Sequence, residues 1–334
     1  MNRQMLAILK VLNQHPDVIV GSRELSRQLT QLGVELTERT VRYHMKMLDE
    51  RGFTQVFGKE GRRITDKGRE ELRNAQVSDR VGLIISKIEN LAFQTTFDLD
   101  RREGKVILNV SHFPARDMKA ALRVMGRVFG SPYIMSDKVM LAHAGEHIGD
   151  NPVPEGMVAI GTVCSVTING VFLKSGIPVV SRFGGVIEVD EGKLSRFTAL
   201  LSYDGSSIDP LVLFIRGRMT SVGSAVAEGR GKILGSFREI PVVSLQAAED
   251  VQRRLAEIGI GGILSMGNPN QPLLEMPVGI DRAGMVIVGG LNPIAALEEA
   301  GIHTENTAMA VLYDYERLVP FGELTAQESS RRTR

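Results

Sequence analysis

Residues 37–51 place cationic and hydrogen-bonding side chains on one side of a short predicted helix. At 3.6 residues per turn, Val41, Met45 and Leu48 share one face. The residues predicted to contact DNA lie away from that apolar face: Arg39, Thr40, Arg42, Tyr43 and Lys46. Cations suit phosphates and forked donors suit base edges, which is the chemistry that the DNA major groove requires. The segment therefore predicts a DNA-reading helix.

The elements before this helix fit a helix-turn-helix. Residues 2–14 repeat apolar side chains at helical spacing, and the pattern stops at His15-Pro16. Ser22 is expected to cap a second helix that ends at Gly33. Its inward leucines are predicted to be Leu25, Leu29 and Leu32. Thr37 is expected to cap the cationic helix, so the order matches a helix-turn-helix whose second helix reads DNA.

A small hairpin with a basic tip is predicted to follow. Residues 53–57 and 62–64 flank the turn Gly58-Lys59-Glu60-Gly61, and Thr65 is expected to cap a further helix to about residue 76. The hairpin residues predicted to contact flanking phosphate are Lys59, Arg62 and Arg63. The pattern over residues 2–76 resembles the winged helix-turn-helix domains of bacterial and archaeal regulators. A winged helix used only for protein contacts is the alternative.

Composition predicts a protein of two or three domains with its basic character at the N-terminal end. The chain has 334 residues, of which 43% are hydrophobic and 24% are charged. Residues 1–80 contain 15 basic and 11 acidic side chains, a net charge of +4, whereas the remaining 254 residues carry −3. The single cysteine excludes an internal disulfide and favours a reducing cytoplasm. We find no signal peptide and no membrane span in the sequence.

The remainder of the chain is duplicated at an offset of 125 to 128 residues. Gly156–Gly161 matches Gly284–Gly289, and Pro114 matches Pro241 in the same order along the chain. We therefore expect a C-terminal α/β effector domain built from two similar repeats related by a pseudo-twofold axis, with small-molecule sites near their junction. The predicted divisions are residues 1–78 for the winged helix, 81–200 and 201–325 for the repeats, and 326–334 for a disordered tail.

The segment that joins the two repeats is expected to be structured. Residues 197–203 alternate between apolar and polar side chains, and residues 211–215 form an apolar run that predicts a second strand.

In each repeat a buried strand is predicted to end in glycine before a helix begins. The free N–H groups of a helix N-terminus suit a carboxylate or a phosphate. Asn292-Pro293 resembles a cap followed by proline at the first helical position. The residues predicted to bind an anionic effector are Thr162, Cys164, Ser165, Thr167, Asn169, Arg182, Gly289, Gly290 and Asn292. The alternative is an ordinary strand-to-helix turn whose caps satisfy themselves.

Enzyme motifs are weak in this sequence. His143-Ala-Gly-Glu146-His147 has the spacing H-x-x-E-H, but Gly145, Gly149 and Asn151-Pro152 favour a loop over the helix that a zinc site would need. Neither a Walker loop nor a G-x-G-x-x-G after a strand is present. Cys164 is expected to pack in the interior. We therefore predict no catalytic residue, no metal and no cofactor.

The whole pattern resembles the NrpR family of nitrogen-regulatory repressors. The resemblance rests on the winged-helix pattern and on three segments, residues 161–170, 176–189 and 289–293. It implies a dimer or higher homo-oligomer on a palindromic double-stranded operator of nitrogen-assimilation genes. It also implies release by the dicarboxylate 2-oxoglutarate, acting as an effector. Some members of the family carry two sensor domains, and this chain has room for one. The alternatives are a regulator with another metabolite or a protein as effector, and an enzyme with an accessory winged helix.

Overall fold

The computed structural model describes residues 3–14, 16–74 and 82–331. His15, where the first helix is predicted to stop, lies outside the described residues. So do residues 75–78, which include the predicted ends of the fourth helix and of the first domain, and residues 332–334 of the predicted tail. Contacts divide the chain into two units, Met1–Arg80 and Val81–Arg334, and each is described by itself.

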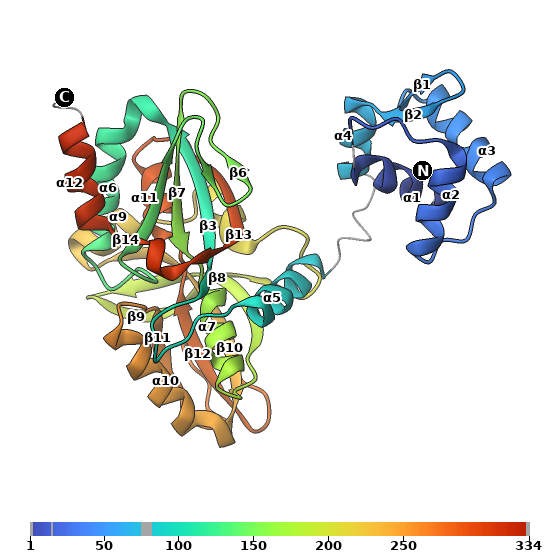
Figure 1. The fold of residues 1–334 in the computed structure, drawn as a ribbon. Coiled ribbons are helices and arrows are strands. Elements are labelled where there is room, and N and C mark those ends of the chain that lie inside the picture. Colours follow the sequence, from blue (N-terminus) through green and yellow to red (C-terminus); the bar gives the residue numbers. More distant parts are fainter. Residues whose placement is uncertain (1–2, 15, 75–81, 332–334) are drawn as a thin grey trace. The chain divides into compact units, whose positions relative to one another are not determined.

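The first unit is a winged helix (Figure 1). Its elements are α1 (Arg3–Gln14), α2 (Ser22–Gln31), α3 (Glu38–Glu50), β1 (Thr54–Phe57), β2 (Gly61–Ile64) and α4 (Asp66–Asn74). The strands β1 and β2 form the predicted antiparallel hairpin. The predicted apolar faces are confirmed except at Leu32, because Ile8, Leu9, Leu25, Leu29 and Met45 are all fully buried in one core.

Two details of the α2 prediction are wrong. Leu32 is 55% exposed, because α2 ends at Gln31 and the chain turns through Gly33, whose φ of 75° is in the left-handed region. Ser22 does not cap α2; Gly21 holds the cap position, and the Ser22 hydroxyl donates to Glu38 Oε1 at 3.0 Å. This hydrogen bond ties the start of α2 to the start of α3.

The second unit contains two five-stranded sheets with helices around them. Its longer elements are α5 (Leu83–Gln94), β3 (Lys105–Pro114), α6 (Met118–Phe129), β4 (Lys138–His143), β7 (Met157–Val163), α7 (Val166–Lys174), β8 (Val180–Asp190), β9 (Lys193–Ser202), α8 (Pro210–Arg216), α9 (Val222–Glu228), β10 (Gly231–Pro241), α10 (Leu245–Glu257), β11 (Ile263–Met266), β12 (Arg282–Val288), α11 (Asn292–Glu299), β13 (Glu305–Asp314) and α12 (Phe321–Arg331). Short elements complete it: β5 (His147–Ile148), β6 (Asn151–Pro152), β14 (Val319–Pro320) and the 3₁₀ turns Ala115–Asp117, Val242–Ser244 and Tyr315–Arg317.

The predicted duplication is confirmed element by element. The first copy contains β3, α6, β4, β7, α7 and β8, and the second repeats this order in β10, α10, β11, β12, α11 and β13. Thus β3 begins at Lys105 and β10 at Gly231, while α7 begins at Val166 and α11 at Asn292. The fold is therefore a winged helix followed by a duplicated α/β domain.

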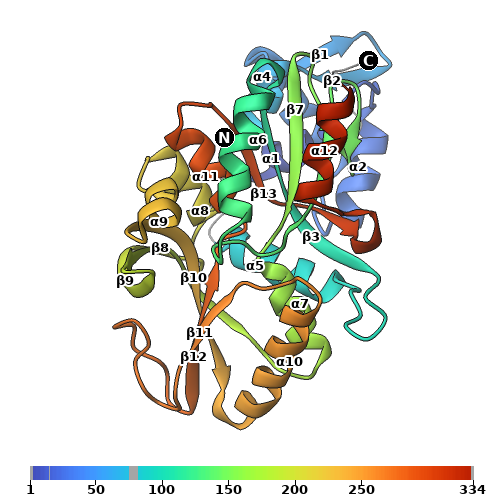
Figure 2. The same ribbon diagram turned by 90° about the vertical axis from the view of Figure 1, so that its left-hand side faces the viewer.

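The two copies exchange strands. The sheets have the orders β13-β3-β7-β4-β14 and β11-β12-β10-β8-β9, and their ladders between described strands are antiparallel. Figure 2 shows β3 and β7 above β10, β11 and β12. The strand β8 belongs to the first copy but pairs with β10 of the second, and β13 belongs to the second copy but pairs with β3 of the first. Each sheet therefore contains strands from both sides of the predicted division at residue 200.

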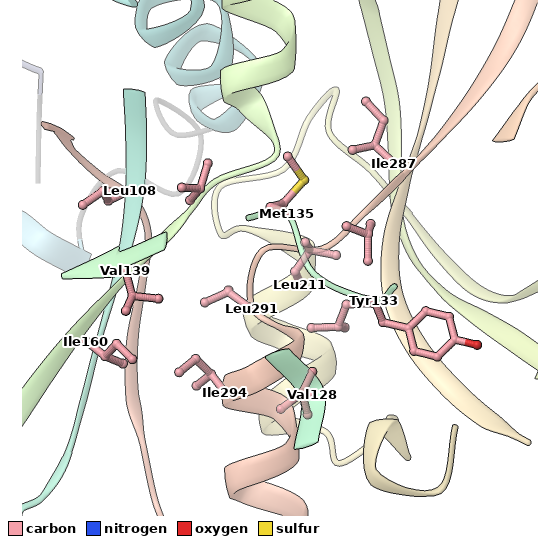
Figure 3. Packing of buried hydrophobic residues seen from close by; sticks show 14 of the residues in the cluster. Leu108, Val128, Tyr133, Met135, Val139, Ile160, Leu211, Ile287, Leu291 and Ile294 are labelled. Atoms are coloured by element: carbon pink, nitrogen blue, oxygen red, sulfur yellow. The ribbon is translucent and has the colours of Figure 1, made fainter. Parts of the chain in front are cut away.

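One hydrophobic core fills the space between the sheets. In Figure 3, Leu291 and Ile294 lie between side chains of the first sheet, such as Leu108 and Ile160, and Ile287 of the second. The helix α11 of the second copy also packs against α6 of the first. The copies therefore share their interior.

The join between the copies differs in part from the prediction. The alternating segment forms β9, as expected, whereas residues 211–215 belong to helix α8 and not to a strand. The Asp209 side chain caps α8 by accepting from Leu211 N at 2.9 Å, and Pro210 occupies the first turn. A short apolar run alone does not distinguish a strand from a buried helix, and here the Asp209 cap is the feature that favours the helix.

The predicted disordered tail is helical over its described part. Residues 326–331 continue α12, which lies beside α6 in Figure 1. Phe321 and Leu324 are buried, and the Phe321 ring stacks on Phe129 with centroids 4.2 Å apart. Glu328, one further turn along, forms a hydrogen bond with the His143 ring at 3.1 Å. These contacts stabilise a segment whose composition alone suggested a solvated chain.

None of the described helices is both long enough and apolar enough to cross a membrane.

We expect Phe321→Ala to lower the free energy of unfolding by about 3 kcal/mol, because it removes a buried ring and leaves a cavity. Urea denaturation of the full chain, followed by far-ultraviolet circular dichroism, measures this. The matched control is Gln327→Ala on the exposed side of α12, where we expect a change of at most about 0.5 kcal/mol. Equal effects of the two substitutions would contradict the packing of α12 against the core.

Candidate functional site

Helix α3 presents the cationic side chains as the sequence predicts. The Thr37 hydroxyl accepts from Thr40 N at 3.3 Å and caps the helix. The apolar face is buried in the core of the unit. Arg39, Arg42 and Lys46 are exposed, and the Tyr43 side chain is 62% exposed. Solvent therefore reaches the whole predicted DNA-contact face.

Two of the three cations on this face form weak ion pairs along the helix. Arg42 Nη2 lies 2.7 Å from Glu38 Oε1, and hydrogen bonds from Arg42 and Ser22 lower the pKa of the Glu38 carboxyl. Lys46 Nζ lies 3.9 Å from Glu50. Exposed pairs of this kind contribute at most about 1 kcal/mol, so a phosphate competes with them readily. Arg39 has no ion pair within the described part of the chain.

The wing contributes fewer available cations than the sequence suggested. Arg62 donates twice to Asp49 Oδ2, at 2.9 and 3.1 Å, and both side chains are largely buried. The Thr54 hydroxyl donates to the other oxygen of Asp49 at 2.6 Å. Arg62 therefore joins the wing to α3, and we remove it from the predicted phosphate contacts. Lys59 is exposed in the turn, and the Arg63 guanidinium lies 5.0 Å above the Phe57 ring.

In the second unit the two glycine loops meet. A Cβ atom on Gly290 would lie 2.2 Å from the carbonyl oxygen of Val163, at the end of β7. Only a residue without a side chain permits this approach between the loop before α11 and the loop before α7. The glycine that we expected to face a ligand therefore holds the two copies together.

Four of the predicted effector residues are structural. Thr167 is fully buried and its hydroxyl accepts from Ile107 N at 3.1 Å. Asn292 is also fully buried; its Oδ1 accepts from Leu234 N at 2.8 Å, and Leu291, not Asn292, holds the cap position of α11. Gly289 packs against Leu234, and Thr162 is buried within β7. The expected cap at Asn292 is therefore wrong, because its side chain serves the neighbouring strand.

Three others, Cys164, Ser165 and Gly290, line a small cavity between the copies. Its volume is about 10 Å³, enough for roughly one water molecule and too small for a dicarboxylate. Burial raises the pKa of the Cys164 thiol to about 11, so it is protonated at neutral pH and is not an activated nucleophile.

The last two, Asn169 and Arg182, line a larger groove beside α7. Its volume is about 380 Å³, within the usual range for small-molecule sites. Ser181 also lines it, and so do Ile85 and Ile88 of α5. Arg182 lies where the register of β8 against β10 shifts, and the Nε of its half-exposed side chain is 3.9 Å from the carboxylate of the buried Glu239. No motif in the sequence pointed to α5 as part of this groove.

Arg238 of β10 is the residue of this region that sequence reasoning missed. It is 1% exposed, and it donates to the Ser165 carbonyl at 3.0 Å, to the Ser165 hydroxyl at 2.9 Å and to Asn169 Oδ1. Burial lowers its pKa to about 10, which leaves it charged at neutral pH. A signal was available: Arg238-Glu239 interrupts a run of small and apolar residues that reads as a buried strand.

The H-x-x-E-H spacing does not form a metal site. His143 ends β4 and His147 begins β5, so a tight loop separates them. His143 Nε2 forms a hydrogen bond with Glu328, while the Glu146 carboxylate accepts a hydrogen bond of 2.7 Å from the backbone N–H of His143. Within residues 3–14, 16–74 and 82–331, no group of three suitable ligands comes together.

Comparison with known proteins supports both units. Residues 81–319 match the family model described as NrpR regulatory domains NRD1 and 2. The chain belongs to the NrpR family. Residues 6–72 also match the ribonuclease R winged-helix domain.

Several relatives carry the name of nitrogen regulators. The global nitrogen regulator NrpRI of Methanosarcina mazei is 35% identical over 95% of this chain and 97% of its own length. The global nitrogen regulator NrpR of Methanococcus maripaludis is 31% identical over 92% of this chain, which spans only 53% of that relative. The crystal structure of a nitrogen repressor-like protein from Methanococcus jannaschii matches with a TM-score of 0.60 and 28% identity, covering 71% of this chain and 97% of that one.

We expect Gly290→Ala to lower the free energy of unfolding by about 1–3 kcal/mol, because the new methyl group overlaps the Val163 carbonyl. Thermal and urea denaturation of the full chain measure the loss. Gly322→Ala in α12 is the control: apart from its own stretch of helix backbone, no described atom lies within 4 Å of its Cβ position, and alanine is the better helix former. A Gly290→Ala protein as stable as the control would contradict the close contact between the loops.

Proposed function

We propose that this chain is a DNA-binding transcriptional repressor of nitrogen-assimilation genes that 2-oxoglutarate releases from its operator. The observation that carries the proposal is the exposed cationic face of α3, in a winged helix on the same chain as an NrpR regulatory domain. The names of the relatives support nitrogen as the regulated theme. Their descriptions as regulators favour this proposal over an enzyme with an accessory winged helix.

On DNA, the proposal assigns direct contact to the α3 face and to the wing tip. Arg39, Thr40, Arg42, Tyr43 and Lys46 enter the major groove, and Lys59 and Arg63 contact flanking phosphate. Two chains bind together as a homodimer or a larger oligomer, with half-sites about one helical turn apart on a palindrome.

The proposed effector site includes residues of α5. In chain order, this helix is the first element of the second unit. Ile84, Ile88 and Ala92 are buried against Cys164, Val166 and Tyr203, and Lys87 Nζ donates to the Ala308 carbonyl at 3.2 Å. Because α5 also lines the groove that contains Asn169 and Arg182, a ligand there contacts the element nearest in sequence to the DNA reader. To release DNA, the ligand must bind the DNA-free state more tightly.

We expect Arg39→Ala and Lys46→Ala each to weaken operator binding by roughly fivefold at about 0.15 M salt, and to reduce the salt slope of log K by about one. Fluorescence anisotropy with a labelled operator fragment over a salt series measures both. Lys10→Ala is the matched control, since it removes one exposed cation from α1 of the same unit. Wild-type affinity and slope in both α3 variants would show that this face does not bind DNA.

We also expect 2-oxoglutarate to raise the Kd for operator DNA, within the roughly 5- to 150-fold span typical of allosteric coupling. The ligand should raise the melting temperature of the full chain without being consumed. Glutamine serves as the control metabolite in the same titrations. Consumption of the ligand would favour an enzyme, and DNA release by a different metabolite alone would identify another effector.

A further inference from the structure

A row of exposed cations lies along the outer face of α6. Arg116, in the turn before the helix, is followed by Lys119, Arg123 and Arg127 at intervals of three and four residues, so all four share one face. The helix itself contains no acidic residue. Within the described part of the chain, the three cations of α6 form no ion pair, and Arg116 has only Asp117, at 3.7 Å. The positive charge of this face is therefore almost uncompensated.

A hollow between α6 and α12 adjoins these cations. Its volume is about 680 Å³, and Lys119 and Arg123 line it. Apolar side chains of both helices form much of the remaining lining: Met118, Leu122 and Phe321. Glu328 also lines the hollow, and it forms a hydrogen bond with His143. Figures 1 and 2 show α6 and α12 on the outside of the second unit, so this face combines an apolar hollow with a cationic border.

The duplication shows that the fold does not require these cations. Pro114 before α6 matches Pro241 before α10, so the two helices correspond at an offset of 127 residues. At this offset, Lys119, Arg123 and Arg127 correspond to Gln246, Asp250 and Arg254. The two charged residues of α10 are neutralised by ion pairs, with Arg253 and Asp100 respectively. The second copy therefore has the same helix without the cationic face.

The charge of this face limits what can cover it. The same face of a second copy does not fit, because like charges would meet across a twofold axis. The chain segments outside the described residues do not fit either, since residues 75–81 contain one acidic and one basic residue, and residues 332–334 contain two arginines and no acid. DNA phosphates would match the cations but leave the apolar hollow unfilled. A protein segment that carries carboxylates beside apolar side chains matches both parts.

The shape of the face favours a helical segment. The helices α6 and α12 are antiparallel, because the Phe321 ring at the start of α12 stacks on Phe129 at the end of α6. A third helix packs along such a pair when its apolar side chains recur every three or four residues. Lys119 and Arg123 are one helical turn apart, so carboxylates one turn apart on the incoming helix would face them. Gly322 lines the hollow without a side chain and leaves space for the partner.

We propose that the face of α6 and α12 binds an acidic amphipathic helix of a partner protein. The apolar side chains of this helix fill the hollow over Leu122 and Phe321, and its carboxylates face Lys119, Arg123 and Arg127. This surface shares no residue with the groove beside α7, so it is a second binding site, for a protein and not for a metabolite.

Selection of peptides from a phage-displayed random library on the immobilised full chain tests the surface. We expect the enriched peptides to combine several carboxylates with apolar residues at helical spacing. Synthetic copies are then titrated by fluorescence anisotropy. The double variant Lys119→Ala with Arg123→Ala should weaken binding about tenfold and reduce its salt dependence. Gly322→Leu, which fills the hollow, should weaken binding by roughly tenfold or more. Lys193→Ala removes an exposed cation of β9 and serves as the control, with wild-type affinity.

The remaining outcomes decide against the surface or against its occupant. Failure to enrich such peptides, or equal affinity for the wild type and both variants, would overturn the inference. Loss of operator affinity in the double variant, with no peptide selected, would assign the cations to DNA. Dissociation of a wild-type oligomer by Gly322→Leu, measured by analytical ultracentrifugation, would assign the face to a second copy, and either result would overturn the partner helix. If Gly322→Leu melts far below the wild type, the charge reversal Arg123→Glu takes its place in the same titrations.

Discussion

The exchange of strands between the two copies determines the geometry of the regulatory unit. Because β8 pairs with β10 and β13 pairs with β3, neither sheet is complete without both copies. The exchange brings the loops before α7 and α11 so close that Gly290 touches the Val163 carbonyl. The proposed effector site depends on the same pairing, since Arg238 comes from β10 while Asn169 and Arg182 come from segments of the first copy.

Periodicity and repetition made much of the fold predictable. The 3.6-residue spacing of Val41, Met45 and Leu48 identified the buried face of α3, and the ordered matches at a constant offset identified the duplication. The wrong predictions have local chemical causes. The apolar run 211–215 forms helix α8 and not a strand because Asp209 caps it, and Leu32 is exposed because α2 ends before it. Contacts with α6 and His143 ordered a tail that looked solvated, and such contacts are not encoded in local sequence.

The candidate effector site was only partly predictable, for a physical reason. A polar residue near a helix start either faces a ligand or satisfies a neighbouring strand, and the sequence does not distinguish the two. Thr167 and Asn292 satisfy β3 and β10, whereas Asn169 faces the groove. Arg238 lies 69 residues beyond Asn169 in the chain, and only the strand exchange makes them neighbours. The signal that remained in the sequence was the charged pair Arg238-Glu239 within an otherwise small and apolar strand.

The two copies show which interactions serve the scaffold and which serve a site. The bond between strand and helix start is kept in both copies although threonine supplies it in one and asparagine in the other. A requirement of folding explains that, because each buried strand N–H needs an acceptor. No such requirement explains Arg238, since its counterpart Ser111 occupies the same place in an equally complete sheet. The two copies therefore differ by a buried charge that the duplicated fold does not itself require.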